Sequence, residues 1–381
     1  MLQGLVAQYD VELVVHLVRP TQDDNTPEPA LLASLAQQDA AVIAPYLGLS
    51  FPEAEQAPGA DLKDLATRIL GNMDAGTFAS AGPRVSACLW QGDKAGLEAL
   101  AAEFGVCADG EAVLTAGDER RKHLKHYSGA MFWYGGEWYW GVDRLSHLED
   151  RLRALGAVRQ QAAKPLAPRQ PVITTPQARA GELSLEYFPS LRSPYTAVSW
   201  QPTLDLARKT GVQLKVRPVL PMVMRGVPAT LEKGFYIFKD AAREARALNL
   251  DYGNFYDPIG EPVKQGYSLY MWAENQGKGQ ALFGSFLNAV FAKGINTTRQ
   301  AGMKAVVHMA GLDWEEAKQH LSDATWEDTL EANRLSMYHG GIWGVPSYRL
   351  LDGQGAEIIS AWGQDRLWLI ARKIQEVAKA E

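Results

Sequence analysis

A serine followed by a proline is the part of the sequence with the clearest chemical potential. Ser193 and Pro194 predict the start of a helix that runs to about Lys209, because serine is favoured at the N-cap and proline at the first helical position. The unpaired N–H groups and the macrodipole at a helix start favour an anion, to which the Ser193 hydroxyl can donate a hydrogen bond. The alternative is that Ser193 only caps its helix.

The two cysteines predict no cysteine-based chemistry. Cys88 and Cys107 are separated by eighteen residues, which excludes a CxxC redox pair, a cysteine-only zinc site and a disulfide-rich scaffold. We expect both to be small buried apolar residues. Lone thiols in a chain without a signal peptide fit a reducing cytoplasm, which is the location we expect.

Composition narrows the class of partner. The chain has 381 residues, 46% of them hydrophobic, and 38 Lys and Arg against 44 Asp and Glu give a net charge of −6. This mild acidity argues against nucleic-acid binding, which needs a basic face. No apolar run approaches the ~20 residues that cross a bilayer. Composition and hydropathy thus argue against nucleic acid and membrane as partners, and the length suggests two domains.

An internal repeat indicates the elements that must position Ser193. Trp140–Leu145 recurs as Trp362–Leu367, and each copy opens a segment of helical periodicity. Upstream, Tyr9–Val15 and Thr210–Val216 both alternate apolar and polar residues, which predicts a strand in each. Because these landmarks keep the same order, we infer a duplication.

A proline-rich stretch separates the copies. It predicts a linker at 158–181 between a first domain at 1–157 and a second at 182–381. The first copy lacks an opening strand, since Leu2–Gln8 match only the end of the second copy's first helix. Either the first domain is incomplete or the chain begins inside a longer parent sequence, and we favour the latter.

The order of elements in the second copy predicts a thioredoxin-like plan. It consists of a strand at 183–188, the helix from Ser193, a strand at 212–217, a helical insert at about 229–335, an extended run at 344–350, a short strand at 357–359 and a final helix. The predicted fold class is thus α/β, with tandem thioredoxin-like domains, helical insertions and a first domain without its opening strand.

The first copy has an aromatic segment in place of a proline turn. Aromatic residues alternate over Gly129–Trp140, which predicts a hairpin with Gly135 and Gly136 at its turn. We expect these aromatics to pack against the partner domain or another chain rather than to bind a ligand.

Three segments of the second copy resemble a known family. Tyr187–Tyr195, Gly344–Tyr348 and Trp362–Leu367 are similar to the signature segments of the 2-hydroxychromene-2-carboxylate isomerase family, which is close to the kappa-class glutathione transferases and belongs to the DsbA-like branch of thioredoxin folds. The similarity covers about 183–381. It implies glutathione as cofactor and a glutathione-dependent isomerisation or transfer on small aromatic or unsaturated acids.

The resemblance also implies roles for individual residues. Ser193 replaces the first cysteine of a redox thioredoxin, which excludes thiol–disulfide exchange by this site. In the family such a serine stabilises the thiolate of glutathione, which adds reversibly to an unsaturated carbon. Val345 and Pro346 match a cis-proline turn that pairs with the ligand backbone. The alternative is an ordinary trans proline at the start of a strand.

Three further residues complete the implied glutathione site. Lys233 falls where relatives bind the glycine carboxylate, although a solvated surface lysine is the alternative. Asp365 is expected to bind the amino group, or else to complement a helix dipole as Asp143 does in the first copy. Gln364 is a polar contact that the first copy has lost, since Val142 takes its place.

Two departures from the family pattern put the substrate in doubt. Relatives commonly have an asparagine near Gly226, for which Arg225 could substitute, and Arg192 replaces an apolar residue. The rival functions are a catalytically silent binding or scaffold protein and, by family name only, a DsbA-family oxidoreductase. Relatives are often dimers, so a homodimer is a possible assembly.

Overall fold

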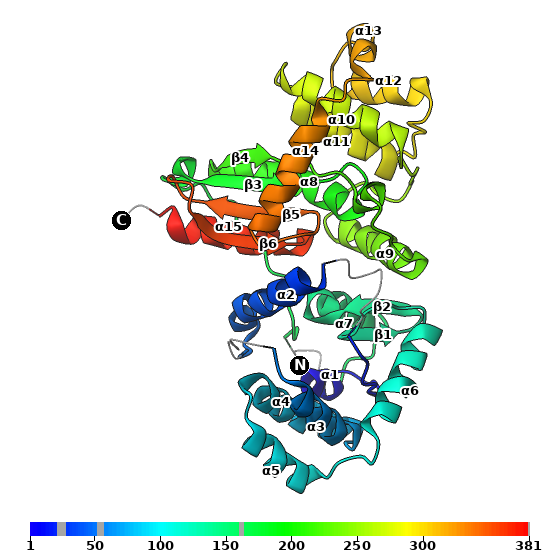
Figure 1. The fold of residues 1–381 in the computed structure, drawn as a ribbon, viewed down its shortest axis with the longest axis vertical. Helices are drawn as coiled ribbons and strands as arrows, with labels where there is room; N and C mark the ends of the chain where they lie inside the picture. The colour runs from blue at the N-terminus through cyan, green and yellow to red at the C-terminus, as the bar shows by residue number, and fades with distance from the viewer. Residues whose placement is uncertain (21–27, 52–56, 160–163, 380–381) are drawn as a thin grey trace. The chain divides into compact units, whose positions relative to one another are not determined.

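The chain forms two compact units in the computed structural model, which describes residues 1–20, 28–51, 57–159 and 164–379 (Figure 1). The first unit comprises Met1–Asn25 and Ala36–Arg169, and the second comprises Thr26–Leu35 and Gln170–Glu381. The candidate site lies in the second.

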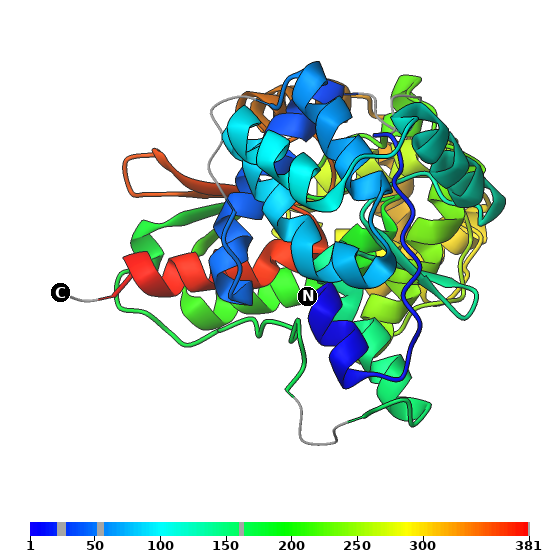
Figure 2. The same cartoon turned by 90° about the horizontal axis from the view of Figure 1, so that it is seen from below.

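A four-stranded mixed sheet forms the centre of the second unit. Its strands are β3 (Ser184–Phe188), β4 (Gln213–Val216), β5 (Ser347–Leu351) and β6 (Glu357–Trp362), in the order β4-β3-β5-β6. The pair β3–β4 is parallel, whereas β3–β5 and β5–β6 are antiparallel. Helices α8 (Pro194–Thr210) and α15 (Leu367–Val377) pack against each other, as Figures 1 and 2 show. The predicted thioredoxin-like plan of this unit is confirmed.

A helical insert joins β4 to β5, as predicted. It begins after the 3₁₀ turn η4 (Met222–Arg225) and contains α9 (Leu231–Ala247), α10 (Glu261–Glu274), α11 (Gly279–Phe291), α12 (Gln300–Met309), α13 (Trp314–Ala317) and α14 (Trp326–His339). One continuous core connects the insert to the sheet, because buried residues of α10 and α11 share a cluster with Tyr187 and Tyr348 of the strands. Burial of this apolar surface is the main stabilising term.

The first unit is mainly helical. Its helices are α1 (Leu2–Gln8), the later part of α2 (Pro29–Ile43), α3 (Ala60–Gly71), α4 (Ala75–Gln91), α5 (Lys94–Phe104), α6 (Gly110–His123) and α7 (Leu145–Ala154). The predicted hairpin is confirmed as β1 (Met131–Tyr134) and β2 (Glu137–Trp140), with Gly135 and Gly136 at positive φ in its turn. The helix predicted after Trp140–Leu145 is confirmed as α7.

The strand predicted at Tyr9–Val15 is wrong. Among the described residues of the first unit, only Tyr9 forms a β-bridge in this region, with Val158, and residues 11–20 form neither helix nor strand. Its counterpart β4 is stabilised by pairing with β3. The described residues of the first unit contain no strand equivalent to β3, so the alternating sequence has no strand with which to pair.

Two further expectations for the first unit need correction. Both cysteines are half-buried rather than buried. Most hairpin aromatics pack inside their own unit: the Trp138 ring N–H donates to the Leu124 carbonyl at 3.0 Å, and the His126 ring lies 4.6 Å from the Trp138 ring. Among the aromatic side chains of the hairpin, only Trp133 is strongly exposed, at 42%.

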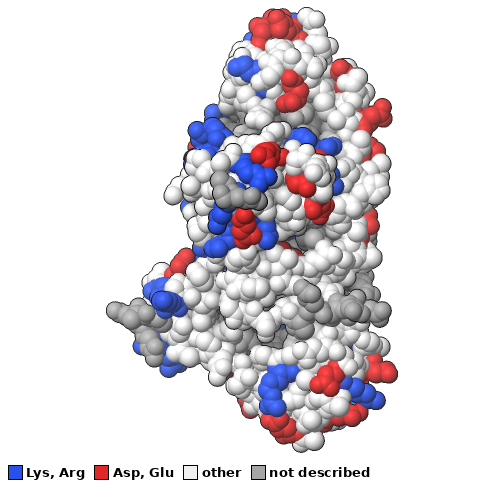
Figure 3. Space-filling view, turned by 90° about the vertical axis from the view of Figure 1, so that its left-hand side faces the viewer, with Lys and Arg blue, Asp and Glu red and all other residues white. Residues whose placement is uncertain are grey.

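The surface shows no concentration of one charge on the face drawn in Figure 3, where basic and acidic side chains are interspersed. No group of three or more His, Cys, Asp or Glu within the described ranges is arranged to hold a metal ion. Of the helices in those ranges, none combines the length and apolarity that crossing a membrane requires.

Candidate functional site

Ser193 is the N-cap of α8, as predicted. Its Oγ accepts a hydrogen bond from the backbone N–H of Thr196 at 3.1 Å, and Pro194 occupies the first helical position. The side chain is half-buried. Because Oγ is the acceptor in the capping bond, the hydroxyl hydrogen remains for another acceptor, and none is recorded among the described residues. Capping and binding an anion are therefore compatible at this serine.

The loop that leads into Ser193 is fixed by the helical insert. The Tyr267 hydroxyl accepts from the Leu191 N–H at 3.2 Å and donates to the Val219 carbonyl at 2.9 Å. The Arg192 guanidinium makes two hydrogen bonds to the Asp257 carboxylate, at 2.7 and 2.6 Å. The positive charge of Arg192, which departs from the family pattern, is thus neutralised by Asp257. A bidentate pair of this kind also fixes the position of the loop that carries Arg192.

The turn before β5 contains a cis peptide bond between Val345 and Pro346. Strand β5 pairs with β3 so that Ser347 lies opposite Phe188, which places this turn beside the end of the strand that precedes the Ser193 loop. The Pro346 carbonyl accepts from the Gly363 N–H at 3.0 Å. The cis-proline turn is therefore in contact with the segment that carries Gln364 and Asp365.

Gln364 and Asp365 form the 3₁₀ turn η6 (Gln364–Arg366) that precedes α15. The Gln364 side-chain nitrogen donates to the buried carboxylate of Glu244 in α9 at 3.0 Å. The Asp365 side chain is 24% exposed, with its Oδ1 3.8 Å from the buried Arg366 guanidinium. Gln364 thus has one structural contact already, while its carbonyl oxygen is the atom that can accept from a ligand.

Lys233 lies in the first turn of α9, whose N-cap is Thr230. Its Nζ is 6.0 Å from the centroid of the Trp343 ring, two residues before Val345. The fold therefore brings Lys233 towards the cis-proline turn. Trp343 itself was missed by sequence reasoning: it is 6% exposed, and its ring N–H has no hydrogen-bond partner among the described residues. Its place just before Gly344–Tyr348 is the signal that could have identified it.

Buried charges connect the start of α8 to α9. The Tyr195 hydroxyl donates to the Asp240 carboxylate at 2.8 Å, and Asp240 forms an ion pair with Arg243 at 3.0 Å. Asp240 is fully buried. Because a buried carboxylate needs both partners to offset its lost hydration, this network holds the two helices in one arrangement next to Ser193.

An apolar surface surrounds the cis-proline turn. Phe188, Trp343, Val345 and Trp362 belong to one cluster, in which they contact three leucines from the start of α2: Leu31, Leu32 and Leu35. These leucines belong to the second unit. Residues of this chain therefore cover part of the apolar surface next to Val345.

Comparisons with known proteins agree with the fold of the second unit. The family model described as a DSBA-like thioredoxin domain matches residues 184–375. Comparison with curated proteins gives no match.

Several solved structures are similar to the chain. A 2-hydroxychromene-2-carboxylate isomerase is 15% identical, with a TM-score of 0.43, over 51% of this chain and 95% of that one. A probable DsbA oxidoreductase from Streptomyces coelicolor is 17% identical, with a TM-score of 0.40, over 52% and 92%. The cytosolic disulfide reductase DsbM from Pseudomonas aeruginosa, solved with GSH, is 16% identical, with a TM-score of 0.37, over 51% and 100%.

Proposed function

The chain belongs to the DSBA-like thioredoxin domain family, and from this premise we propose that its second unit binds glutathione and acts as a glutathione-dependent isomerase or transferase on small aromatic or unsaturated acids. The observation that carries the proposal is the Ser193 hydroxyl, which caps α8 and still has a hydrogen to donate. A glutathione sulfur at this helix start is stabilised as a thiolate, so its pKa falls below the reference of about 8.5.

The thiolate is the nucleophile of the proposed reaction. It adds to an unsaturated carbon of the substrate, and the displaced π electron pair is delocalised into the conjugated acid or carbonyl group. The former double bond then rotates as a single bond. Elimination returns the electron pair, breaks the carbon–sulfur bond and regenerates the thiolate. Ser193 acts by donating a hydrogen bond to sulfur, which stabilises the anionic states before addition and after elimination.

The glycine carboxylate of glutathione is assigned to Lys233. Two donors support this assignment, because the Lys233 ammonium and the Trp343 ring N–H lie close together next to the turn. A buried N–H without a partner costs about 1–3 kcal/mol, which a ligand carboxylate oxygen would recover. The backbone of the half-buried Val345, ahead of the cis-Pro346, is assigned to the peptide backbone of glutathione.

The γ-glutamyl amino group is assigned to Gln364 and Asp365. The Gln364 side-chain nitrogen donates to Glu244, so its side-chain carbonyl oxygen is the atom that can accept a hydrogen bond from the amino group. An ammonium group needs acceptors only, and the partly exposed Asp365 carboxylate supplies the charge.

The decisive experiment compares three side chains at position 193. Glutathione binding to the full chain is measured by calorimetry, and turnover is measured with 2-hydroxychromene-2-carboxylate. We expect Ser193→Ala to lower turnover at least tenfold. Ser193→Asp is the matched control, because aspartate caps a helix as well as serine does but repels a thiolate, so it too should be inactive while the fold is retained. Unchanged turnover in both variants would remove Ser193 from the mechanism.

A binding or scaffold role is the second candidate, and one observation favours it. Leu31, Leu32 and Leu35 cover part of the apolar surface next to Val345. If calorimetry detects no glutathione binding from micromolar to millimolar concentrations, this role replaces the enzymatic one. Insulin reduction should be absent in either case, since Ser193 provides no thiol for a mixed disulfide.

A further inference from the structure

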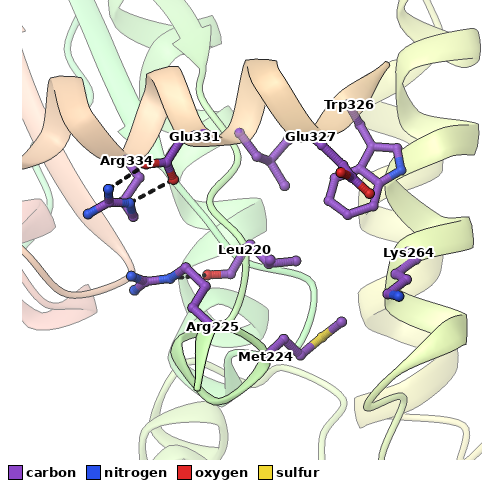
Figure 4. Close-up of a pocket in the computed structure, with 9 residues that line it drawn as sticks. Leu220, Met224, Arg225, Lys264, Trp326, Glu327, Glu331 and Arg334 are labelled. Atoms are coloured by element: carbon purple, nitrogen blue, oxygen red, sulfur yellow. Dashed lines mark hydrogen bonds and ion pairs between the residues drawn. The ribbon is translucent and has the colours of Figure 1, made fainter. Parts of the chain in front are cut away.

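A concave site lies in the second unit, between η4, α10 and α14 (Figure 4). Its volume is about 230 Å³, and it contains none of the residues assigned to glutathione. Pockets for drug-sized ligands are usually about 300–1,000 Å³, so this one suits a smaller molecule than a tripeptide.

The middle of the pocket is apolar. Leu220 and Met224 come from η4 and the residues before it, whereas Trp326 and Leu330 come from α14. Trp326 and Leu330 are 4% and 1% exposed, and the Trp326 ring packs 5.7 Å from the ring of Tyr267. These walls are therefore held by the core and offer a fixed surface to an apolar body.

The charged side chains lie at the two ends of the apolar stretch in Figure 4. The Arg334 guanidinium donates two hydrogen bonds to the Glu331 carboxylate, at 2.8 and 2.5 Å. These two charges neutralise each other. The hydrogen bond from Arg334 is also the largest cause of the lowered pKa of Glu331, to which the charge of Arg225 adds. The pocket has three other charged side chains: Arg225 lies near this pair, and Lys264 and Glu327 lie at the other end.

Arg225 has unused hydrogen-bonding capacity. Its Nε donates to the Leu220 carbonyl at 3.4 Å, while its two terminal nitrogens have no recorded hydrogen bond among the described residues. Figure 4 shows this bond to Leu220, which orients the guanidinium and leaves its terminal nitrogens available. A planar guanidinium with two adjacent N–H donors matches a carboxylate bidentately.

We propose that this pocket binds a small organic acid with an apolar body. The carboxylate pairs with Arg225, and the body lies against Leu220, Trp326 and Leu330. At the far end Lys264 and Glu327 carry opposite charges, so the anion preference comes from the Arg225 end. The proposal does not rest on glutathione binding, since it uses none of the same residues.

The test uses 2-naphthoate as probe and the full chain as protein, with calorimetry as the readout. We expect saturable binding that Arg225→Gln weakens at least fivefold, and that Arg225→Lys, which keeps the charge but loses the planar fork, weakens less. Arg299→Gln is the matched control, because Arg299 is an exposed arginine outside the pocket. Thermal unfolding of each variant establishes that the fold is retained.

Two ligands separate charge from apolar contact. The neutral 2-naphthamide should bind at least fivefold more weakly than 2-naphthoate. Inorganic phosphate should bind more weakly as well, because it lacks an apolar body. Equal binding of the acid and the amide, tighter binding of phosphate, or an unchanged affinity in Arg225→Gln would each overturn the proposal. Ser193→Ala should leave 2-naphthoate binding intact, so failure here and failure of the proposed enzymatic function are distinguishable.

Discussion

The two copies of the repeated motif end in the same local structure, one in each unit. In both, an antiparallel hairpin ends at a tryptophan, a glycine at positive φ follows, and a 3₁₀ turn leads into a helix, namely α7 in the first unit and α15 in the second. The motif arginine is 4% exposed in the first copy and 5% in the second, and its Nη1 donates to the preceding aspartate carbonyl at 3.2 and 3.4 Å. The motif arginine therefore has the same structural role in both copies.

The differences between the two copies lie where the candidate site is. The pairing of Met131 with Trp140 and of Ser347 with Trp362 places Ala130 at the position of Pro346. Ala130 has φ of 54°, whereas Pro346 follows a cis bond. In the part of the first copy that the structure describes, α1 has no side-chain cap comparable to Ser193, and the sequence has Val142 in place of Gln364. The same local fold therefore occurs in the first unit without the cis-proline turn, the serine cap and the glutamine that are proposed to bind glutathione.

The largest expected effect is a loss of stability on removal of the arginine that both copies of the motif share. Arg144→Ala and Arg366→Ala should each lower the free energy of unfolding of their own unit by about 3 kcal/mol, because each removes a buried charged side chain and leaves its partners unsatisfied. Urea titrations with hydrogen exchange of α7 and α15 measure the two units separately. The exposed Arg120 provides the control, for which Arg120→Ala should change stability by less than about 0.5 kcal/mol. If only one of the two variants lowers the free energy of unfolding of its unit, the arginine does not have the same structural role in both copies.

Acidification should distinguish the two units. Burial lowers the pKa of His126 to about 4, and His126 packs beside the hairpin of the first unit. The unfolded chain binds a proton near pH 6.5, which the folded His126 does not bind until about pH 4. The free energy of unfolding of the first unit should therefore fall by up to about 3 kcal/mol as the pH decreases over this range.

Substitution of the imidazole isolates this effect. His126→Phe should flatten the pH dependence of urea unfolding between pH 7 and pH 4.5, because phenylalanine keeps a ring against Trp138 without titrating. His339→Gln, at an exposed histidine of the second unit, should leave the slope unchanged. An identical slope in wild type and His126→Phe would show that other groups control the acid stability of the first unit.

A smaller effect is expected where the two copies have different anchors. The Tyr9 hydroxyl donates to the buried Glu149 carboxylate at 2.8 Å, and burial raises the pKa of Tyr9 to about 12, so the donor stays protonated. Tyr9→Phe should cost the first unit about 1–2 kcal/mol. Its counterpart Thr210 donates within its own helix, to the Leu206 carbonyl, and Thr210→Val should cost less. Urea unfolding of the full chain measures the loss of stability in both variants. Equal losses would contradict the expectation that the Tyr9 hydrogen bond contributes more to stability than that of Thr210.

Local features of the fold could be predicted from the sequence. The Ser193 cap, the turn at Gly135 and Gly136, and the helices after both copies of the motif depend on neighbouring residues, and the structure contains all of them. The strand at Tyr9–Val15 could not be judged locally, because alternation is necessary for a half-buried strand but a pairing partner decides whether it forms.

The side chains around the candidate site could not be predicted either, because they too depend on contacts between residues that are far apart in the sequence. Gln364 meets Glu244 across 120 positions of sequence, and Arg192 meets Asp257 across 65. No periodicity encodes such pairs, since they arise only when the helical insert folds back on the sheet. The same holds for the organic-acid pocket, because Arg225 lies just before the insert and Trp326 lies in its last helix, α14.

The smallest expected effect concerns the aspartates of the two copies. Asp143→Asn and Asp365→Asn should each change stability by less than about 1 kcal/mol, because each mainly removes a favourable charge near a helix start. Only Asp365→Asn should weaken glutathione binding, by about fivefold, as expected for one partly exposed charge-assisted hydrogen bond. Calorimetry on both variants measures the difference. Equal glutathione affinities would mean that Asp365 is structural, like Asp143, and that recognition of the amino group depends on the carbonyl oxygen of Gln364, the residue at which the two motifs differ.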